Sequence, residues 1–225
     1  MSLTLTLEGN SSLLETSYMP PIVLDGTWVI GLIDFHTYNS IPNVDETNNI
    51  IGIGDQHFIE IPVGAYEIEE INGYLNEKLT ISGNYIVLRG NNNTLKCEIE
   101  SDVDVDLTHP RSIAPLLGFR PQVLEARKQH ISNQPVNILK VDDIRIECSL
   151  ACGAFDNGRP SNVIYGFYPE VPHGYKLIQR PATIIYYPIT TNVISDIKVR
   201  IIDQKNRPIN FRNEHITVRL QLLQT

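Results

Sequence analysis

The sequence leaves little room for disulfide bonding, because its 225 residues contain only three cysteines. An odd number of cysteines without a secretory signal is typical of free thiols in a reducing compartment. Cys148 and Cys152 lie four residues apart in an expected strand, and at ~3.3 Å per residue they are about 13 Å apart, too far for a disulfide. We therefore interpret Cys97, Cys148 and Cys152 as small buried residues rather than as disulfide partners or metal ligands.

Segments that would insert the chain into a membrane are also lacking. No apolar run reaches the ~18 residues that a membrane-spanning helix requires, so we expect no membrane span. The N-terminal stretch MSLTLTLEGNSS has neither a basic n-region nor an apolar h-region, so we expect no secretory signal.

Patterns of catalytic and metal-binding residues are absent too. The six histidines show no HxH or HExxH spacing, and no phosphate-binding loop or local pair of nucleophile and base is recognisable. We therefore predict that the protein is not an enzyme, binds no cofactor, and has no catalytic, cofactor-binding or metal-ligating residues. The histidines are His36, His57, His109, His130, His173 and His215.

Basic residues are scarce in the first part of the chain. Residues 1–88 contain one, Lys78, against twelve Asp and Glu, whereas residues 89–225 contain seventeen Lys and Arg against fourteen Asp and Glu, for a net charge of −8. An acidic chain repels the phosphates of nucleic acids, so direct nucleic-acid binding is not expected. The asymmetry is either ordinary surface solvation or a pair of complementary surfaces that meet between neighbouring subunits.

Three acids alternate with apolar residues in one short stretch. Asp102, Asp104 and Asp106 would all point to one face of a strand, with the apolar residues between them pointing to the other. A solvent-facing strand explains this row most simply. A Ca²⁺ ion that neutralises the row, or an Arg cluster on a neighbouring subunit, remain as alternatives.

Short strands dominate what the sequence does contain. Residues 8–26 are rich in turn formers, so we expect residues 1–26 to form an N-terminal strand and an extended arm or loop, and residues 27–225 to form one domain. Alternating or β-branched runs predict strands at 2–7, 27–38, 49–53, 57–61, 85–89 and 94–100, and near 135–150, 163–168, 183–189, 193–203 and 215–223.

One segment has a helical period. Ile68, Ile71, Leu75 and Leu79 recur at helical spacing within residues 66–79. They form an apolar stripe on one side of the helix, which requires a sheet to cover it.

A compact apolar turn follows at residues 112–119. We expect one helical turn there, closed by Gly118 at positive φ as a C-terminal cap. Leu116, Leu117 and Phe119 should be largely buried.

Many short strands, one short amphipathic helix and long loops predict an all-β fold, a single jelly-roll antiparallel β-sandwich. An immunoglobulin-like sandwich is less suitable, because the chain is about twice as long and lacks the Cys…Trp…Cys pattern. A chain of this length can bury an extensive core without disulfides.

Several segments resemble the penton (minor capsid) proteins of Polinton/Maverick elements and adintovirus-like viruses. The similarity covers roughly residues 57–223, and it depends on the number and order of structural motifs rather than on catalytic signatures. The segments are 61–71, 91–96, 112–113, 116–119, 135–138, 144–148, 174–175, 187–189, 200–204 and 214–220.

This resemblance implies a structural protein of an icosahedral, virus-like capsid. Five copies would form a homopentameric ring at the vertex, next to a separate double jelly-roll major capsid protein. The resemblance implies localisation in the virion after synthesis in the host cell, and it implies no catalytic residues.

Two other classes of function remain open on this fold. A carbohydrate- or receptor-binding jelly roll would need an exposed aromatic platform, for which Tyr38, Tyr165 and Tyr168 are candidates. A cupin-like enzyme would need His and Glu ligands clustered inside the barrel, and the spacing provides none.

Overall fold

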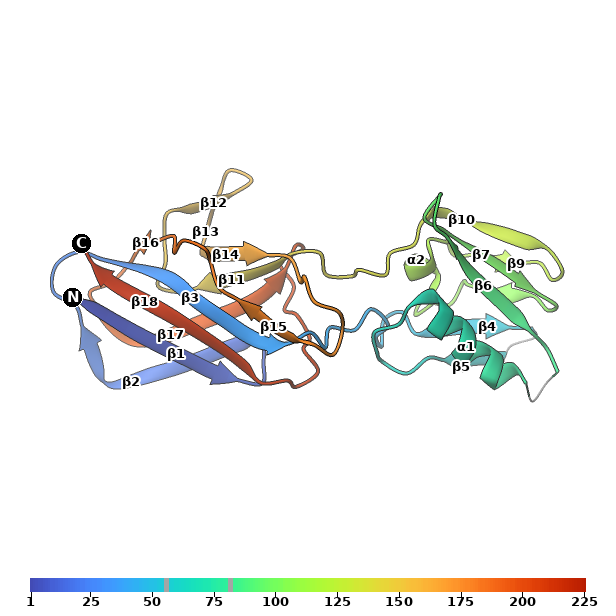
Figure 1. Cartoon of the computed structure of the whole chain (residues 1–225), viewed down its shortest axis with the longest axis horizontal. Helices are drawn as coiled ribbons and strands as arrows, with labels where there is room; N and C mark the ends of the chain where they lie inside the picture. Colours follow the sequence, from blue (N-terminus) through green and yellow to red (C-terminus); the bar gives the residue numbers. More distant parts are fainter. Residues whose placement is uncertain (55–56, 81–82) are drawn as a thin grey trace. The chain divides into compact units, whose positions relative to one another are not determined.

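The computed structural model describes residues 1–54, 57–80 and 83–225. The chain forms two compact units (Figure 1): unit 1 comprises Met1–Ile41 and Val141–Thr225, and unit 2 comprises Pro42–Lys140. Each unit has its own cluster of buried hydrophobic residues. Unit 2 is therefore an insertion in the sequence of unit 1, between strand β3 (Trp28–Tyr38) and strand β11 (Ile144–Cys148).

Unit 1 is an antiparallel sandwich of two sheets (Figure 1). One sheet has the strand order β1-β18-β3-β15, with β16 paired to β3, and the other has the order β14-β11-β17-β2. A separate hairpin, β12–β13, completes the unit. Besides β3 and β11, the strands are β1 (Ser2–Gly9), β2 (Leu13–Val23), β12 (Ala154–Asp156), β13 (Arg159–Ser161), β14 (Val163–Phe167), β15 (Lys176–Gln179), β16 (Tyr187–Pro188), β17 (Val193–Asp203) and β18 (Ile216–Gln224).

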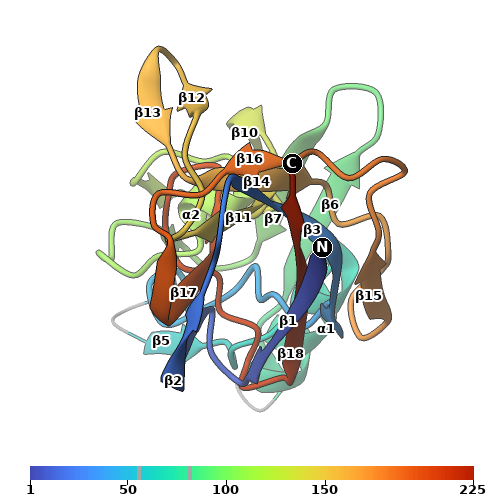
Figure 2. The same cartoon turned by 90° about the vertical axis from the view of Figure 1, so that its left-hand side faces the viewer.

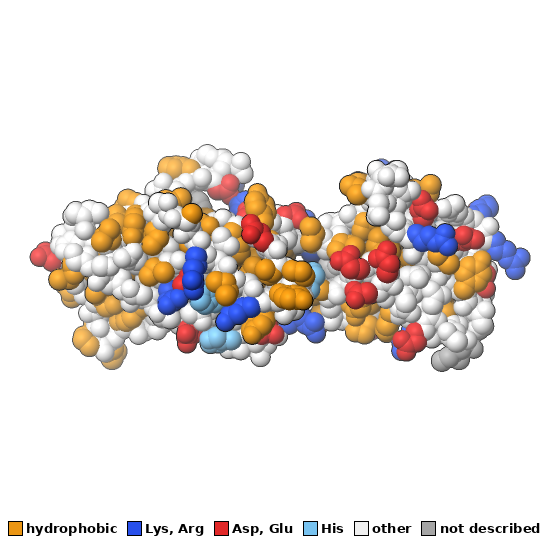
Figure 3. Space-filling model, in the orientation of Figure 1, with side chains coloured by type: hydrophobic (Ala, Val, Ile, Leu, Met, Phe, Trp, Pro, Cys, Tyr) orange, Lys and Arg blue, Asp and Glu red, His pale blue; other side chains and the backbone are white. Residues whose placement is uncertain are grey.

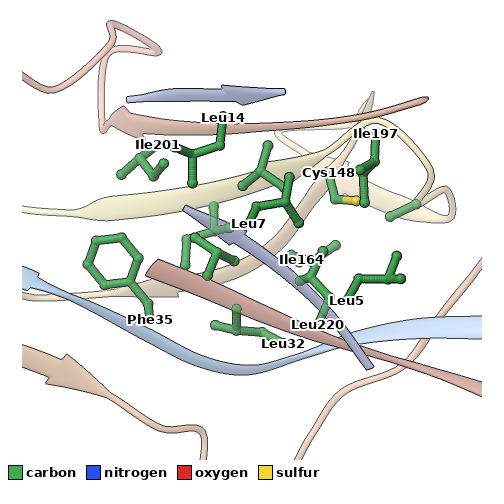
Figure 4. Close-up of a cluster of buried hydrophobic side chains, with 14 of the residues drawn as sticks. Leu5, Leu7, Leu14, Leu32, Phe35, Cys148, Ile164, Ile197, Ile201 and Leu220 are labelled. Carbon is green, nitrogen blue, oxygen red and sulfur yellow. The ribbon is translucent and has the colours of Figure 1, made fainter. Parts of the chain in front are cut away.

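Alternation along the strands builds the core of this sandwich. In β1, Leu5 and Leu7 are buried while Thr4 and Thr6 are exposed, because successive side chains of a strand point to opposite faces. Figure 4 shows part of this core, to which strands of both sheets contribute. The side chains labelled there are Leu5, Leu7, Leu14, Leu32, Phe35, Cys148, Ile164, Ile197, Ile201 and Leu220. The expected all-β class, an antiparallel jelly-roll sandwich with one short amphipathic helix, is confirmed.

The expectation of an arm or loop over residues 8–26 is wrong for most of that segment. Residues 13–23 form β2, which pairs with β17 and buries Leu14 in the core. The turn-forming Pro20 and Pro21 favoured a loop, but β2 is an edge strand whose register with β17 shifts near these residues. Proline is tolerated at sheet edges and bulges, because no ladder hydrogen bond is required of it there.

Unit 2 is a smaller β-rich unit that also contains the two helices. Its sheets have the strand orders β10-β7-β6 and β5-β4-β8-β9. The expected boundary between residues 26 and 27 does not coincide with the limits of this unit, because residues 42–140 bury a core of their own. The elements are β4 (Ile50–Ile53), β5 (His57–Glu60), α1 (Ile68–Leu79), β6 (Ile86–Asn91), β7 (Lys96–Ser101), β8 (Val105–Asp106), α2 (Ala114–Leu117), β9 (Val123–Leu124) and β10 (Gln129–Pro135).

Helix α1 buries the four residues of the expected apolar stripe. The helix begins after Glu67, whose backbone N–H donates to the Glu70 carboxylate at 2.8 Å. Two asparagines of α1 bond the edge of β6: Asn72 accepts from the Leu88 N–H at 2.9 Å, and Asn76 donates to the Ile86 carbonyl at 2.6 Å. The helix therefore covers a sheet edge that would otherwise be open to another chain.

The apolar turn at 112–119 is confirmed. Leu116, Leu117 and Phe119 are buried, and Gly118 closes α2 at φ 77°. A Cβ built on Gly118 would lie 2.2 Å from the Gln134 carbonyl oxygen. Glycine is required here for two reasons, the left-handed backbone and the close approach of another segment.

Other expected strands are shorter than the sequence suggested. Only β11 is a strand between 136 and 150, and only β16 between 183 and 189. The loop at 204–208 is a turn organised by Asp203, whose carboxylate accepts from the Lys205 and Arg207 N–H groups at 2.8 Å each and from Arg207 Nε at 2.8 Å.

Replacing Gly118 with Ala should destabilise the protein by at least about 2 kcal/mol, because it combines a left-handed backbone with a collision against the Gln134 carbonyl. Gly73 is the matched control. It lies on the exposed side of α1, a Cβ there meets nothing within 4 Å, and Gly73→Ala should stabilise by about 1 kcal/mol. Chemical unfolding gives the free energy of unfolding of both variants. Equal changes relative to the wild type would contradict the tight packing at Gly118.

Asp203 should make stability depend on pH. Burial alone would raise the pKa of Asp203, but the hydrogen bonds from Arg207 and Lys205 outweigh it, so the pKa is lowered. The stabilisation by Asp203 is therefore complete at pH values above its pKa of ~3.9 in the unfolded chain. It is lost as the pH falls through the lower pKa of the folded state. Asp203→Asn should cost about 1.5–3 kcal/mol at pH 6. The difference in unfolding free energy between this variant and the wild type should become smaller below pH ~4. A difference that does not change with pH would refute this role of the carboxylate.

Candidate interaction surfaces

The two outer faces of the unit 1 sandwich differ in composition. We call the outer side of β2, β17 and β11 the β17 face, defined by Glu15, Lys198, Arg200, Glu147 and Arg145. Ion pairs link its strands: Lys198–Glu15 at 2.9 Å joins β17 to β2, and Arg200–Glu147 at 2.8 Å joins β17 to β11. Exposed pairs of this kind contribute ~0–1 kcal/mol each. They make this face charged and well hydrated rather than especially stable.

The hairpin β12–β13 projects from the side of the β17 face (Figures 1 and 2). Arg145 of β11 holds its base, since it donates to Asp143 at 2.6 Å and to Asp156 of β12 at 2.9 Å. The hydrogen bond that Arg145 donates to Asp143, together with the charges of both acids, raises the pKa of Arg145 in spite of burial, which alone would lower it. Phe155 of β12 is 71% exposed, which is unusual for an aromatic side chain in a small projecting hairpin.

The opposite outer face combines charged and uncharged residues. We call it the β3 face and define it by the outward-facing residues of the first sheet, which are Thr4, Thr6, Glu8, Asp34, His36, Lys176, Ile178, Thr217, Arg219 and Gln221. In Figure 3 it is largely white and orange, with Lys, Arg and His gathered in one group.

The segment 184–186 covers one end of this face. A Cβ on Gly31 of β3 would lie 2.4 Å from the Ile184 side chain, and the Tyr186 hydroxyl donates to Gln221 at 2.6 Å. Ile185 in this segment is itself 55% exposed.

A buried carboxylate anchors the charged group of the β3 face. Asp34 has a side chain only 3% exposed, and Arg219 approaches it with two nitrogens, Nε at 2.8 Å from Oδ1 and a terminal nitrogen against Oδ2. His36 Nε2 lies 3.6 Å and Arg180 Nε lies 4.0 Å from the same oxygen. A register shift between Arg219 and Leu220, opposite β3, places Asp34 directly across from Arg219.

These neighbours alter the pKa values of the group. The hydrogen bond and charge of Asp34 raise the pKa of Arg219. Burial lowers the pKa of His36, and the charges of Arg219, Arg180 and Lys176 lower it further against the opposing effect of Asp34. The lowered pKa makes the His36 imidazole neutral at neutral pH.

The acidic row does not form one site. Each carboxylate bonds a different part of unit 2: Asp102 accepts from the Tyr85 N–H, Asp104 from the Ala126 N–H, and Asp106 from the Thr108 N–H, each within 2.8 Å. Only Asp106 lies in a strand, β8, so the expected single strand through the row is wrong. Within residues 1–54, 57–80 and 83–225, no three His, Cys, Asp or Glu side chains gather in a way that could hold a metal ion.

The three cysteines are free thiols. Burial raises the pKa of Cys97 to about 12 and raises the pKa of Cys148 as well. Cys152 departs from the expectation, because it is half-buried and follows the end of β11 rather than lying in the strand. Its Sγ lies 3.3 Å from the Pro188 carbonyl oxygen.

The three tyrosines considered as a sugar platform play different roles. Tyr165 packs against the core of unit 1, and its hydroxyl accepts from Gln179 at 3.0 Å. Tyr38 and Tyr168 are 44% and 69% exposed. With Tyr165 inside the sandwich, the three do not form one exposed platform.

A cleft of about 880 Å³ lies in unit 2 between β4, β5 and α1. Its walls mix apolar and charged side chains, including Phe58, Tyr74, Lys78 and Asp104. Phe58 also packs on His109, with ring centroids 5.3 Å apart. No sequence motif pointed to this cleft.

The net charge divides unequally between the two units. Unit 1 contains ten Lys and Arg and twelve Asp and Glu, a net charge of −2, whereas unit 2 contains eight and fourteen, a net charge of −6. The acid-rich residues 1–88 belong to both units, so they do not form a single acidic surface. The charge asymmetry that matters lies between the inserted unit and the sandwich.

Comparison with known proteins shows a similarity of fold. No family model matches the sequence, and no curated protein matches it. The fold is similar to that of the mavirus penton protein, known from the crystal structure of its selenomethionine-labelled form, with a TM-score of 0.52 and 12% sequence identity over 100% of this chain and 99% of that chain. The similarity establishes a shared fold. None of the described helices is long and apolar enough to span a membrane.

Arg219 should contribute more to stability than a matched arginine on the other face. Arg219→Gln leaves a buried carboxylate without its two-pronged partner and should cost about 1.5–3 kcal/mol. Arg200→Gln removes an exposed pair with Glu147 and should cost at most about 1 kcal/mol. Urea unfolding of both variants measures the difference, and equal costs would mean that water already solvates Asp34.

Proposed function

We propose that this protein is a penton, the minor capsid protein that forms the five-fold vertex of an icosahedral, virus-like capsid. The observation that carries the proposal is the fold similarity to the mavirus penton protein, which extends over 100% of this chain and 99% of that chain. A match limited to the sandwich would be common among jelly rolls, which host many functions. This one includes the inserted unit 2 as well.

In this role the protein is a structural component of the virion and not an enzyme. Five copies form a homopentameric ring, and a separate double jelly-roll major capsid protein surrounds it. A closed ring requires two different patches on each subunit, one of which binds the other patch on the next copy. The unlike outer faces of unit 1 are suited to such a contact.

Carbohydrate or receptor binding receives less support. That function would require an exposed aromatic platform, and Tyr165, one of the three tyrosines considered for it, packs against the core.

Native mass spectrometry of the purified protein, over a range of protein concentrations, tests the ring. The expected result is a five-subunit species in equilibrium with the 25.4 kDa monomer. Raising the salt concentration should favour the ring, because salt screens the repulsion between copies that each carry a net charge of −8. A stable dimer or trimer as the end point of assembly would contradict the proposal.

A further inference from the structure

The hairpin β12–β13 is a short projection that is anchored at its base. Its two-residue turn has Asn157 at φ 49° and Gly158 at φ 78°, the backbone of the type I′ turn that joins tightly twisted strands. Asp156 ties the hairpin to Arg145 of the sandwich. Side chains alternate along a strand, so Phe155 is on the other side of the ribbon from Asp156, and it is 71% exposed.

An exposed aromatic side chain is of the kind that contributes most to protein interfaces. Aromatic residues are enriched in interface cores, and a few of them supply most of the binding free energy. A two-stranded hairpin without a cover is only marginally stable by itself. A partner that covers Phe155 would therefore stabilise the hairpin as well as bind it.

The β3 face has the composition of a receiving surface. Its outward-facing residues include Thr4, Thr6 and Thr217, and two aliphatic side chains, Ile178 of β15 and Ile185, are 47% and 55% exposed. Interface cores are depleted of charged residues, so the exposed Ile178 and Ile185 are the part of this face best suited to the centre of a contact. The Asp34–Arg219 group lies beside Ile178, since Ile178 pairs with His36 in the sheet.

The area of the β3 face is appropriate for a subunit contact. Its three long strands β1, β18 and β3 contain 8, 9 and 11 residues. At ~3.3 Å per residue and ~4.8 Å between strands, the four-stranded face offers roughly 500–700 Å². A standard interface buries ~600–1,000 Å² on each partner, so this face alone reaches the lower end of that range.

The hairpin and the β3 face lie on opposite flanks of the sandwich. In Figure 2, β12 and β13 lie on the side of β17, away from β15. Two unlike patches on opposite flanks cannot meet within one subunit, but they can join successive subunits of a ring.

Charge also favours unit 1 as the contact between copies. Unit 2 has a net charge of −6, so neighbouring copies of it repel each other, whereas unit 1 is close to neutral at −2. An interface between sandwich units therefore has less electrostatic repulsion to overcome.

We infer that in the assembled ring the hairpin β12–β13 of each copy, through Phe155, packs against the β3 face of the next copy. This inference rests on the proposed function, because a ring supplies the second copy. It deepens that function by assigning the two complementary surfaces of the contact.

Two variants of the full chain test the assignment. Phe155→Glu damages the hairpin only, and Ile178→Glu damages the β3 face only, so each alone should fail to form rings in native mass spectrometry. Val123→Glu is the control, because Val123 is an exposed apolar residue of β9 in unit 2, 53% exposed, and it should assemble like the wild type. Thermal melts establish that each variant is folded.

Mixing the two variants gives the sharper result. The intact hairpin of an Ile178→Glu copy can bind the intact β3 face of a Phe155→Glu copy, but each partner's other surface is damaged. The mixture should therefore form 1:1 dimers and nothing larger. If a glutamate variant melts well below the wild type, Phe155→Ala and Ile178→Ala replace the pair, and Phe155→Ala should weaken the contact at least about 30-fold.

Several outcomes would overturn the inference. Five-subunit rings formed by folded Phe155→Glu or Ile178→Glu would show that the contact lies elsewhere, while the proposed vertex function would stand. Folded variants that do not assemble and form no mixed dimer would also reject the pairing of hairpin and face. A wild-type protein that forms a stable dimer or trimer would count against both the inference and the proposed function.

Discussion

The architecture depends on the placement of the last strand. β18 lies between β1 and β3 and pairs along its whole length with each of them, so the sheet that carries the β3 face cannot form without the C-terminal residues. The partners of β18 are more than 170 residues away in sequence, and the whole of unit 2 is inserted between β3 and β11. Bringing such distant strands together costs the conformational entropy of closing a long loop. The contacts between the strands offset this cost only once they have paired. The separate core of unit 2 shortens the effective loop, because a folded insert holds its own ends in a fixed arrangement.

Alternation explains both the stability of the sandwich and its surfaces. The inward half of each strand forms one hydrophobic cluster, and the outward half determines what each face can bind. On β17 the outward residues Lys198 and Arg200 form ion pairs, whereas on β1 the outward residues include the uncharged Thr4 and Thr6 and one acid, Glu8. The same pattern that specifies the fold thus gives the subunit two unlike flanks, as a cyclic assembly requires.

Local signals in the sequence predicted local structure well. The stripe in α1 and the glycine that closes α2 are confirmed, because they depend on spacing and on one residue's backbone preference. Strand β2 was not predicted, because Pro20 and Pro21 suggest a loop unless the partner strand β17 is known. The insertion of unit 2 could not be inferred either, since nothing in the composition at residues 41–42 or 140–141 marks a boundary.

The functional surfaces were the least predictable part. The charge asymmetry along the sequence suggested complementary surfaces, but folding distributes the acidic residues 1–88 over both units. Asp34 did provide an unused signal, since a lone acid in an otherwise apolar strand requires a buried partner. Phe155 provided another, because it stands two residues before an Asn-Gly turn, where it must lie on a projecting hairpin.

Electron microscopy of particles that contain both this protein and a double jelly-roll major capsid protein from the same genome tests the central claim most directly. After co-expression of the two, the account expects icosahedral particles with a five-fold density at each vertex into which five copies of the unit 1 sandwich fit. Closed particles whose vertices consist of the major capsid protein alone, or particles that carry this protein away from the five-fold axes, would contradict it.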